Sequence, residues 1–459
     1  MSFISVSFLI FLPIVFGAYW ILGRHQRWQN LLLLAASYVF YGWWDWRFLI
    51  LILITSASSY ASGLLLRREE RGERKEERNN RRWVLTANVV LNLGILAVFK
   101  YYNFFLDNLR LLIPGLDAPT LNLILPVGIS FYTFQSLSYT IDVYHRRLQP
   151  TRDVVAFFAY IAFFPQLVAG PIERATHLLP QMLGQRHFRY DEAADGLRRI
   201  LWGLFKKMVI ADNCALAVNQ IWENYAEADA LTLVAGMLLF TFQIYCDFSG
   251  YSDIAIGTAR LFGIQLMENF RLPYFSASMP EFWRRWHISL MTWFRDYLYI
   301  PLGGSREGTW KWVRNLLLVF LLSGLWHGAN WTFVVWGLYN ACLVIAWRYL
   351  PLRSILLTFL LTAVGWVLFR SSCLNEAVAY LQRMGILLAS FDFGTITYGK
   401  LALLWCVLLV AVEWLQRRRE HPLQLDALPV AMRWTVYYVL FFVIFFARGE
   451  EQTFIYFQF

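Results

Sequence analysis

Charged residues are scarce in this sequence. Asp, Glu, Lys and Arg make up 16% of the 459 residues, whereas about 25% is usual in a soluble globular protein. This shortage excludes a soluble enzyme of ordinary composition. Hydrophobic residues make up 58% of the chain and include 21 Trp and 38 Phe, which is more than one or two soluble cores can bury. The composition therefore predicts a protein that crosses the membrane several times.

Cysteine is also scarce, and the sequence lacks several common catalytic motifs. The five cysteines are scattered through apolar segments, without a CxxC pair or a metal-ligand spacing to histidine, which argues against a disulfide framework or a zinc site. A P-loop, HExxH, GxSxG and a GxGxxG opening a helix are all missing. We therefore expect no bound metal or cofactor. The net charge of +10 indicates membrane orientation rather than a nucleic-acid partner.

The stretch 1–22 lacks a basic region before its apolar part and has no small-residue cleavage signal. It therefore predicts a first span rather than a removed signal peptide. Further apolar stretches of membrane length follow, separated by short polar links. The expected spans lie at about 3–22, 30–44, 47–66, 83–101 and 121–141, and later near 354–370, 399–416 and 430–447.

Basic residues concentrate in the links on one side of these spans. The links 23–29, 67–82 and 143–152 all lie on that side when the spans are counted as above. By the positive-inside rule it is the cytoplasmic side, so both the N-terminus and the acidic tail after Arg448 are expected outside. The run 67–82 could alternatively bind a partner or lipid headgroups.

Pro165, Gly170 and Pro171 interrupt an apolar run that begins as a span at Val154. A helix cannot continue cleanly through these residues. In a membrane such a break survives only where protein or a wet cavity surrounds it, and Gln166 would then face that cavity. The alternative is an ordinary helix end followed by an interfacial loop.

Carboxylates occur inside the long apolar segment 231–262, at Asp247 and Asp253. Asp247 and Tyr251 are four residues apart, hence on one helix face. Intramembrane carboxylates usually pair with a cation or with hydrogen-bond donors. Asp247 could form a structural pair with Arg284 or Arg285, or it could take part in chemistry or proton movement.

The segment 278–299 begins with Ser278 and Glu281 at capping-box spacing, with proline in the first turn. We expect one helix near the membrane interface. His287 lies at the centre of its apolar stripe. A histidine in that position is either a hydrogen-bonded core residue or a functional one.

The segment 314–340 contains His327 within a clearly apolar span. Gly324 and Gly328 have GxxxG spacing and allow close approach of a backbone or a ligand. Asn330, three residues after His327, could hydrogen-bond the imidazole and fix its tautomer. A neutral imidazole suits general-base work near neutral pH. The alternative is that His327 joins neighbouring helices by a hydrogen bond.

Five sequence segments together resemble the membrane-bound O-acyltransferases, and the resemblance spans nearly the whole chain. They are PEFWRRWHISL (280–290), YLYIPLGG (297–304), LSGLWHGANW (322–331), PQLVAGP (165–171) and YCDFSGY (245–251). Within the family, the chain is similar to the branch that acylates exported bacterial polysaccharides, with the alginate and peptidoglycan O-acetylation subunits as the nearest types.

The resemblance implies an all-α polytopic membrane protein of about 10–13 helices, some re-entrant or interfacial, around a central tunnel. Through it an acyl group passes from a cytoplasmic donor, expected to be acetyl-CoA, to an acceptor on the other face. His327 would be the principal catalytic histidine and His287 the second. The implied divisions are N-terminal helices over 1–125, a catalytic core over 126–348 and C-terminal helices over 349–459, in a bacterial inner membrane.

The last residues, 454–459, are almost wholly apolar and aromatic, and such an end is rarely left free in solvent. They resemble the F-x-Y-x-x-F ending of the partner peptide of teichoic-acid D-alanylation, in which the tyrosine carries the acyl group. Tyr456, activated by His327, would then pass the acyl group to a separate extracytoplasmic transferase of the SGNH type. Simple hydrophobic docking of the tail is the alternative.

Two other functions use the same polar residues. A proton-coupled transporter would also need broken helices and intramembrane carboxylates, but it predicts an internal repeat, and none is found. A scaffold for a polysaccharide-export complex would tolerate loss of His327. Supporting or tunnel-lining roles are expected for Asn330, Trp326, Asp247, Tyr251, Gln166, Arg284 and Arg285.

Overall fold

The computed structural model describes residues 1–459 except 68–74, 169, 351 and 458–459, and for 75–77 and 457 it describes the backbone alone. The predicted basic link 67–82 therefore lies partly outside the described residues. Everything regular in the described part is helical, with no strand. The all-α polytopic fold class predicted from the sequence is confirmed.

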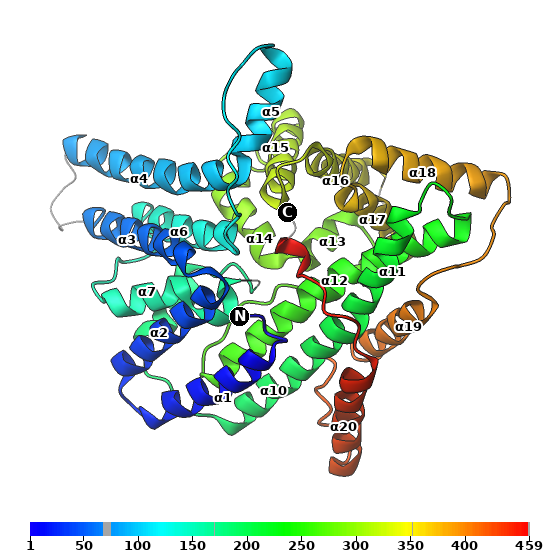
Figure 1. Ribbon diagram of the computed structural model, residues 1–459. Helices are drawn as coiled ribbons and strands as arrows, with labels where there is room; N and C mark the ends of the chain where they lie inside the picture. The colour runs from blue at the N-terminus through cyan, green and yellow to red at the C-terminus, as the bar shows by residue number, and fades with distance from the viewer. Residues whose placement is uncertain (68–74, 169, 351, 458–459) are drawn as a thin grey trace. The chain divides into compact units, whose positions relative to one another are not determined.

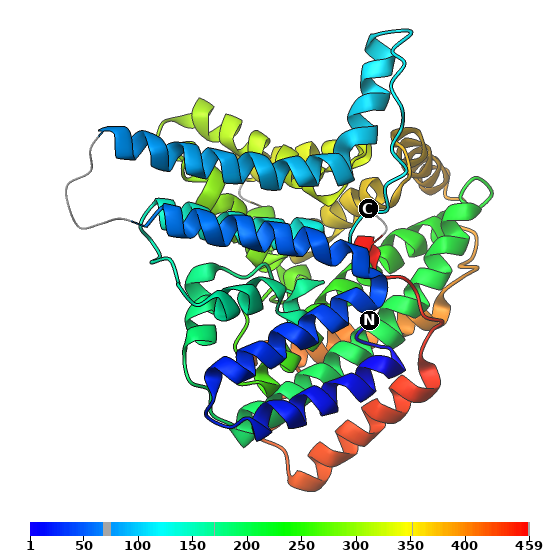
Figure 2. The same cartoon turned by 60° about the vertical axis from the view of Figure 1, so that its left-hand side comes forward.

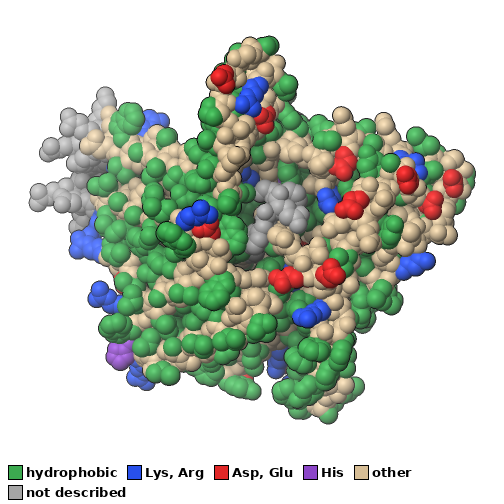
Figure 3. All heavy atoms as spheres, in the orientation of Figure 1, with side chains coloured by type: hydrophobic (Ala, Val, Ile, Leu, Met, Phe, Trp, Pro, Cys, Tyr) green, Lys and Arg blue, Asp and Glu red, His purple; other side chains and the backbone are tan. Residues whose placement is uncertain are grey.

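Several apolar helical stretches are long enough to cross a membrane. Among the described residues they are Gln26–Leu65, Arg78–Leu112, Ala230–Leu261 and Val430–Ala447, with shorter apolar helices at Val6–Ile21, Val154–Leu167 and Ile355–Arg370. Hydrophobic side chains cover wide areas of the face in Figure 3, and charged ones are sparse there. This surface suits a lipid environment.

The chain divides into two compact units, and the first comprises residues 1–196 and 258–267. Its helices are α1 (Val6–Ile21), α2 (Gln26–Asp45), η1 (Trp46–Phe48), α3 (Leu49–Leu65), α4 (Lys75–Leu96), η2 (Ala97–Tyr101), α5 (Tyr102–Leu112), α6 (Ile129–Tyr144), α7 (Val154–Ala162), α8 (Phe164–Leu167) and α9 (Ala175–Leu183). Helices α3, α4 and α6 pack side by side, and α2 packs on α7 (Figures 1 and 2).

The second unit comprises residues 197–257 and 268–459. It contains most of α10 (Tyr190–Leu204) and α12 (Ala230–Leu261), together with η3 (Phe205–Ala211), α11 (Asp212–Glu223), η4 (Pro273–Phe275), α13 (Met279–Arg285), α14 (Ile288–Phe294), η5 (Arg295–Tyr299), α15 (Thr309–His327), α16 (Trp331–Tyr349), α17 (Ile355–Arg370), α18 (Leu374–Ala389), α19 (Lys400–Leu415), α20 (Val430–Ala447) and η6 (Ile455–Phe457).

Two glycines allow α15 and α16 to pack at backbone contact. A Cβ atom on Gly324 would lie 2.2 Å from the Phe333 carbonyl oxygen, and one on Gly337 would lie 2.3 Å from the Phe320 carbonyl oxygen. Real side chains cannot approach that closely, so only glycine fits at either position. This tight hairpin fixes the end of α15, where His327 lies.

The segment expected to span 121–141 is helical only from Ile129. Pro126 precedes the helix, and Gly128 at its start has a φ of 73°. A Cβ on Gly128 would also lie 2.5 Å from the Leu167 carbonyl oxygen. Proline and a left-handed glycine together end the extended stretch and delay the helix.

The break after α7 is enclosed by protein. Phe163–Leu167 and Gly170–Arg174 are buried, and Ala169 within the PQLVAGP segment lies outside the described residues. Glu173 accepts a hydrogen bond from the Met267 amide at 2.5 Å and lies 2.7 Å from His177 Nδ1. Such surroundings are what a broken helix within a membrane needs, and an exposed interfacial loop does not have them.

Candidate active site

His327 ends α15 and lies buried in the second unit, at 3% exposure. Aromatic rings surround its imidazole. The ring-centroid distances from His327 are 5.1 Å to Trp326, 5.2 Å to Trp336, 5.4 Å to Phe369, 5.5 Å to Tyr456 and 6.4 Å to His287. Such an enclosure excludes bulk water, which strengthens electrostatic interactions within it.

His287 lies at a helix break. The single helix expected over 278–299 is wrong: α13 ends at Arg285, α14 begins at Ile288, and η5 follows. One half of the capping box is present, since Ser278 Oγ accepts the Glu281 amide at 3.3 Å, whereas the Glu281 carboxylate accepts the amide of Ala277 at 3.0 Å. At the interruption Trp286 is extended, with a φ of −101° and a ψ of 129°, and His287 has a φ of 42° in the left-handed region. For a residue other than glycine this conformation is strained and often marks function.

Asn269 hydrogen-bonds both to the backbone at the helix break and to the His287 imidazole. Its carbonyl oxygen accepts the Ile288 amide at 2.9 Å, and its side-chain Nδ2 donates to Ser252 Oγ at 3.1 Å. Oδ1 of Asn269 is therefore an acceptor, and it lies 3.0 Å from His287 Nδ1. This arrangement assigns a proton to Nδ1 and leaves Nε2 as the basic nitrogen. Burial lowers the pKa of His287 to about 3, so the ring is neutral at physiological pH.

The C-terminal tail folds back into the second unit after α20, as the red segment in Figure 1 shows. The Gly449 amide donates to the Met208 carbonyl oxygen at 2.9 Å, and the Ile455 amide donates to Asp247 Oδ2 at 2.7 Å. Phe454 and Ile455 are buried. Of the predicted tail segment, residues 458–459 lie outside the described residues.

Lys207 anchors this tail from η3. Its Nζ lies 2.7 Å from Asp212 Oδ1 and 2.9 Å from Asp247 Oδ1, and it donates to the Gln452 carbonyl oxygen at 3.0 Å. All three charged side chains are almost fully buried. The lysine therefore connects α12 and the start of α11 to the chain end.

The predicted pairing of Asp247 with Arg284 or Arg285 is wrong. Its cation is Lys207. Arg285 pairs instead with Glu281 at 2.6 Å on the same helix, and Arg284 is exposed. Both arginines lie in the last turn of α13, where Arg284 is exposed and Arg285 is partly exposed, and the described ion pairs do not join either of them to Asp247.

Tyr456 lies against His327 and the aromatic residues of α12. Its ring centroid is 4.4 Å from that of Phe248 and 5.7 Å from that of Phe454, which in turn lies 4.4 Å from Tyr251. The Tyr456 hydroxyl oxygen is buried and has no hydrogen bond within the described part of the chain. Burial, and to a lesser extent the Asp247 carboxylate, raise the pKa of this phenol well above its usual value. Ionisation therefore needs a nearby base.

The predicted hydrogen bond from Asn330 to His327 is replaced by a helix cap. Asn330 Oδ1 accepts the Thr332 amide at 3.0 Å at the start of α16, and Nδ2 donates to the Ser372 carbonyl oxygen at 2.8 Å. A spacing of three residues places Asn330 beside His327 only on one continuous helix. Gly328 instead takes an extended conformation directly after His327, so Asn330 is not on the same helix.

Of the predicted supporting residues, Trp326, Asp247 and Tyr251 therefore contact either the histidines or the tail. Gln166 belongs to the first unit, where it is buried and its Nε2 donates to the Tyr160 carbonyl oxygen at 3.1 Å.

Sequence reasoning missed Lys207 and Asn269. A signal for the first was present, since Lys206 and Lys207 stand together in an otherwise apolar stretch, and cations in such a stretch need partners. Lys206 lies 2.5 Å from Asp253 Oδ2, and Asp253 also pairs with Arg199 at 2.9 Å. For Asn269 no local pattern distinguishes it from an ordinary loop residue.

The arrangement combines a buried imidazole, a second imidazole of fixed tautomer and a buried phenol. An imidazole next to a phenol can remove its proton and so produce a nucleophile. No group of three or more His, Cys, Asp or Glu side chains within the described ranges is arranged to hold a metal ion. The chemistry open to these residues is proton transfer coupled to attack on an electrophilic carbon.

Comparison with known proteins gives consistent matches. The membrane-bound O-acyltransferase family, MBOAT, matches residues 44–360. A Pseudomonas putida protein named probable alginate O-acetylase is 44% identical over 404 residues, which cover 85% of this chain and 80% of that protein. The peptidoglycan O-acetyltransferase of Helicobacter pylori is 32% identical over 512 residues, covering 98% and 95%.

A more distant relative is the teichoic acid D-alanyltransferase of Bacillus subtilis, which is 30% identical over 256 residues, covering 51% of this chain and 62% of that protein. The family match covers more than half of the chain, and the first two relatives extend over most of it. The chain therefore belongs to the membrane-bound O-acyltransferase family and is an acyltransferase.

Proposed function

We propose that this acyltransferase passes an acetyl group from a cytoplasmic thioester donor, acetyl-CoA, across the membrane for O-acetylation of an exported bacterial polysaccharide such as alginate. The observation that supports this proposal most directly is the 5.5 Å distance between the ring centroids of His327 and Tyr456 inside a closed aromatic cluster. The similarity to a probable alginate O-acetylase over 85% of the chain supports the substrate class.

In the proposed first step, the Tyr456 oxygen attacks the thioester carbonyl carbon while His327 takes the phenol proton. A carbon–oxygen ester bond forms and the carbon–sulfur bond breaks. The departing thiolate then takes the proton from the His327 imidazolium, which returns the histidine to its neutral form. The products are an acetyl-tyrosine and a free thiol.

In the second step, a hydroxyl group attacks the acetyl-tyrosine and restores the Tyr456 phenol. This hydroxyl belongs to an extracytoplasmic transferase of the SGNH type or to the polymer. Because Lys207 and Asp247 both hold the tail backbone, the phenol is positioned before the donor binds, which lowers the entropic cost of the attack. His287, with Nε2 as its basic nitrogen, would orient a reacting group or assist proton transfer.

Peptidoglycan O-acetylation is the second candidate function. The Helicobacter pylori relative with that name aligns with 98% of this chain, and the alignment covers 95% of that relative. The extent of the alignment therefore does not separate the two candidate acceptors. Both candidates use the same chemistry at His327. They differ in the acceptor polymer, which chemical analysis of the acetylated product identifies.

We also propose that the protein lies in the bacterial inner membrane with both termini outside. The support is the gathering of basic residues in alternate links of the sequence. In that orientation the chain end reaches the aromatic cluster from the extracytoplasmic side, and the donor enters from the cytoplasm.

Acetyl content of the exported polymer, measured in cells, tests the proposal with His327→Ala and Tyr456→Phe. We expect both variants to lose polymer acetylation. Tyr438→Phe is the matched control, since it removes the same hydroxyl from an exposed tyrosine of α20. Membrane abundance of each variant is measured in parallel.

If Tyr456→Phe keeps full acetylation while His327→Ala loses it, the tyrosine relay is wrong and transfer is direct. If His327→Ala also keeps full acetylation, the proposed chemistry as a whole is wrong.

A further inference from the structure

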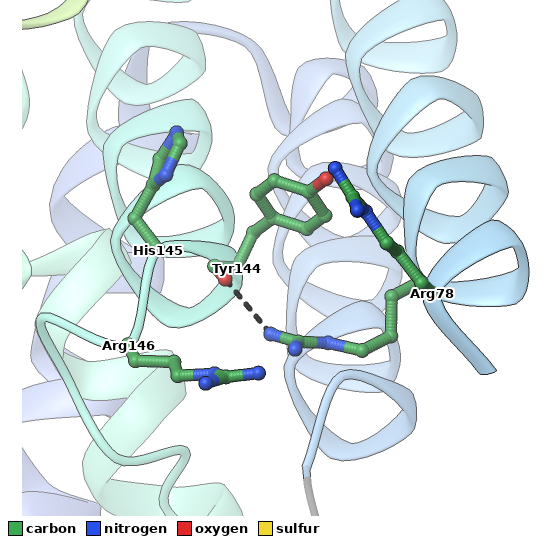
Figure 4. A pocket seen from close by; sticks show the side chains of 5 residues that line it. Arg78, Tyr144, His145 and Arg146 are labelled. Carbon is green, nitrogen blue, oxygen red and sulfur yellow. Dashed lines mark hydrogen bonds between the residues drawn. The ribbon is translucent and has the colours of Figure 1, made fainter. Parts of the chain in front are cut away.

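A basic pocket lies in the first unit, where the start of α4 packs against the end of α6. It has a volume of about 260 Å³ and is lined by Arg78, Arg81, Tyr144, His145 and Arg146. Figure 4 shows Arg78 on α4, Tyr144 at the end of α6, and His145 and Arg146 directly after that helix. Three guanidinium groups and an imidazole therefore share one small concave space, at a distance in sequence from the residues of the candidate active site.

Contacts between the two helices hold one wall of this pocket. Arg81 Nη2 donates to the Tyr144 carbonyl oxygen at 2.8 Å, the bond drawn dashed in Figure 4. The same guanidinium lies 5.4 Å from the Tyr144 ring centroid. The Tyr144 carbonyl belongs to the last turn of α6, where carbonyl groups lack helical partners. Arg81 is thus fixed in place rather than extended into solvent.

Arg146 occupies a backbone position that favours glycine. The Arg147 amide donates to the Asp142 carbonyl oxygen at 2.8 Å, and the Arg146 amide donates to that of Val143 at 3.1 Å. These two bonds form a Schellman motif, in which Arg146 is the left-handed residue, with a φ of 62°. An arginine there is less stable than glycine. A strained arginine at a position that favours glycine suggests that its guanidinium group has a function that glycine could not provide.

The described lining of the pocket is basic. None of the five described lining residues is acidic. The adjacent Asp142 is buried and pairs with Arg147 at 3.6 Å. Burial and the Arg147 guanidinium lower the pKa of His145; Asp142 raises it, and Arg81 lowers it further. The imidazole therefore experiences a net positive field, which an anion in the pocket would neutralise.

We propose that this pocket binds a phosphate group, carried either by a phospholipid headgroup or by a small phosphate-bearing solute. Guanidinium groups recognise phosphate through paired N–H donors in a planar fork, and several of them converge here. The orientation of the protein in the membrane does not by itself account for this arrangement of basic residues. The positive-inside rule needs basic residues somewhere in a link, and it requires neither a concave arrangement nor an arginine at a strained cap.

Arg146→Gly is an informative variant, because it removes a lining guanidinium and installs the residue that the backbone prefers. We expect its unfolding temperature to be no lower than that of the wild type, so a loss of binding cannot come from misfolding. Arg110→Gln is the matched control. It removes one arginine charge from α5, outside the pocket.

The full-length protein in neutral detergent is tested in two arms. Inorganic phosphate is titrated at constant ionic strength by calorimetry, and retention of phosphatidylglycerol against phosphatidylcholine is measured by native mass spectrometry. We expect Arg146→Gly to weaken at least one of these by about tenfold or more, and Arg110→Gln to leave both unchanged.

Phosphate binding alone would identify a solute as the ligand, and selective phosphatidylglycerol retention would identify a lipid headgroup; either result supports the site. Absence of both, or equal binding by the wild type and Arg146→Gly, overturns it.

Discussion

The His327 imidazole is enclosed by aromatic rings from α15, α16, α17 and the chain end. With water excluded, the base and the phenol meet without competition from solvent. General-base catalysis contributes about 10² to 10⁴-fold in rate. His327→Ala should therefore lower acetyl transfer by the protein in lipid nanodiscs by at least about 100-fold.

An exposed histidine provides the control for that measurement. His25→Ala, at the start of α2, should keep the wild-type rate in the same nanodisc assay. Equal rates for His327→Ala and the wild type would remove His327 from the mechanism.

Asn269 is expected to act as a positioning residue through His287. Asn269→Ala removes the acceptor of the Nδ1 proton, so the ring can rotate or change tautomer. We expect kcat to fall by about tenfold or more, less than for His327→Ala, with KM for the donor little changed.

Ser289→Ala is the matched control, because Ser289 Oγ donates to the same Asn269 oxygen at 2.9 Å, so this variant removes a different hydrogen bond to Asn269. If both variants lower kcat equally, the effect is structural and the positioning role of Asn269 is wrong.

At the residue scale, the sequence singled out His327, His287 and Asp247 as polar groups in apolar segments, and Tyr456 through the resemblance of the chain end to the partner peptide of teichoic-acid D-alanylation; their catalytic roles stay predictions. It did not identify their partners. Asp247 and Ile455 are 208 residues apart in the chain, and no local pattern connects them. The error for Asn330 has a local cause: the prediction extended a helix through Gly328, where the chain becomes extended.

At the scale of elements, the adjacent lysines of η3, Lys206 and Lys207, allow anchoring of the tail to be tested separately from the overall stability of the protein. Lys207→Met should cost about 3 to 5 kcal/mol, because it leaves buried carboxylates without their cation. It should also release the tail, which Lys207 holds through the Gln452 carbonyl. Limited proteolysis of the C-terminal segment should therefore become faster.

Lys206→Met is the comparison variant. Among the described residues Lys206 pairs with Asp253 and donates to Ser249 Oγ, neither of which belongs to the tail, so its loss should lower the unfolding temperature while leaving the tail protected. Equal proteolysis of the two variants would contradict anchoring by Lys207.

The α15 and α16 hairpin is the second element whose packing bears on the site. Gly324→Ala places a methyl group against the Phe333 carbonyl oxygen and should destabilise the protein by about 1 to 3 kcal/mol. Gly385→Ala, at an exposed position of α18 with no atom within 4 Å of the added methyl, should instead stabilise by about 0.5 to 1 kcal/mol. Thermal unfolding in detergent measures both, and equal shifts in the same direction would contradict the backbone contact.

Helix positions were largely predictable from apolar run length, and helix interruptions were not. The runs near 3–22, 354–370 and 430–447 correspond to α1, α17 and α20. The break at His287 escaped detection because no glycine or proline marks it. The Ile288 amide, which has no helical partner at the break, donates to the Asn269 carbonyl oxygen instead. A contact between residues 19 positions apart is not visible as local periodicity.

At the scale of the whole molecule, the predicted orientation is testable with reporters. A fluorescent-protein fusion inserted in the basic link 417–419 should fluoresce, because that link is expected in the cytoplasm. An alkaline-phosphatase fusion near the N-terminus should be active, because that end is expected outside. The opposite pair of results would invert the topology and place the tail on the cytoplasmic side.

The central claim is a covalent relay in which Tyr456 carries the acetyl group and His327 places it there. The most direct measurement is the mass of the C-terminal peptide after the purified protein, in lipid, has been incubated with acetyl-CoA. The wild type should gain one acetyl group on Tyr456, while His327→Ala and Tyr456→Phe should gain none. An unmodified wild-type peptide, or equal acetylation in His327→Ala, would contradict the relay.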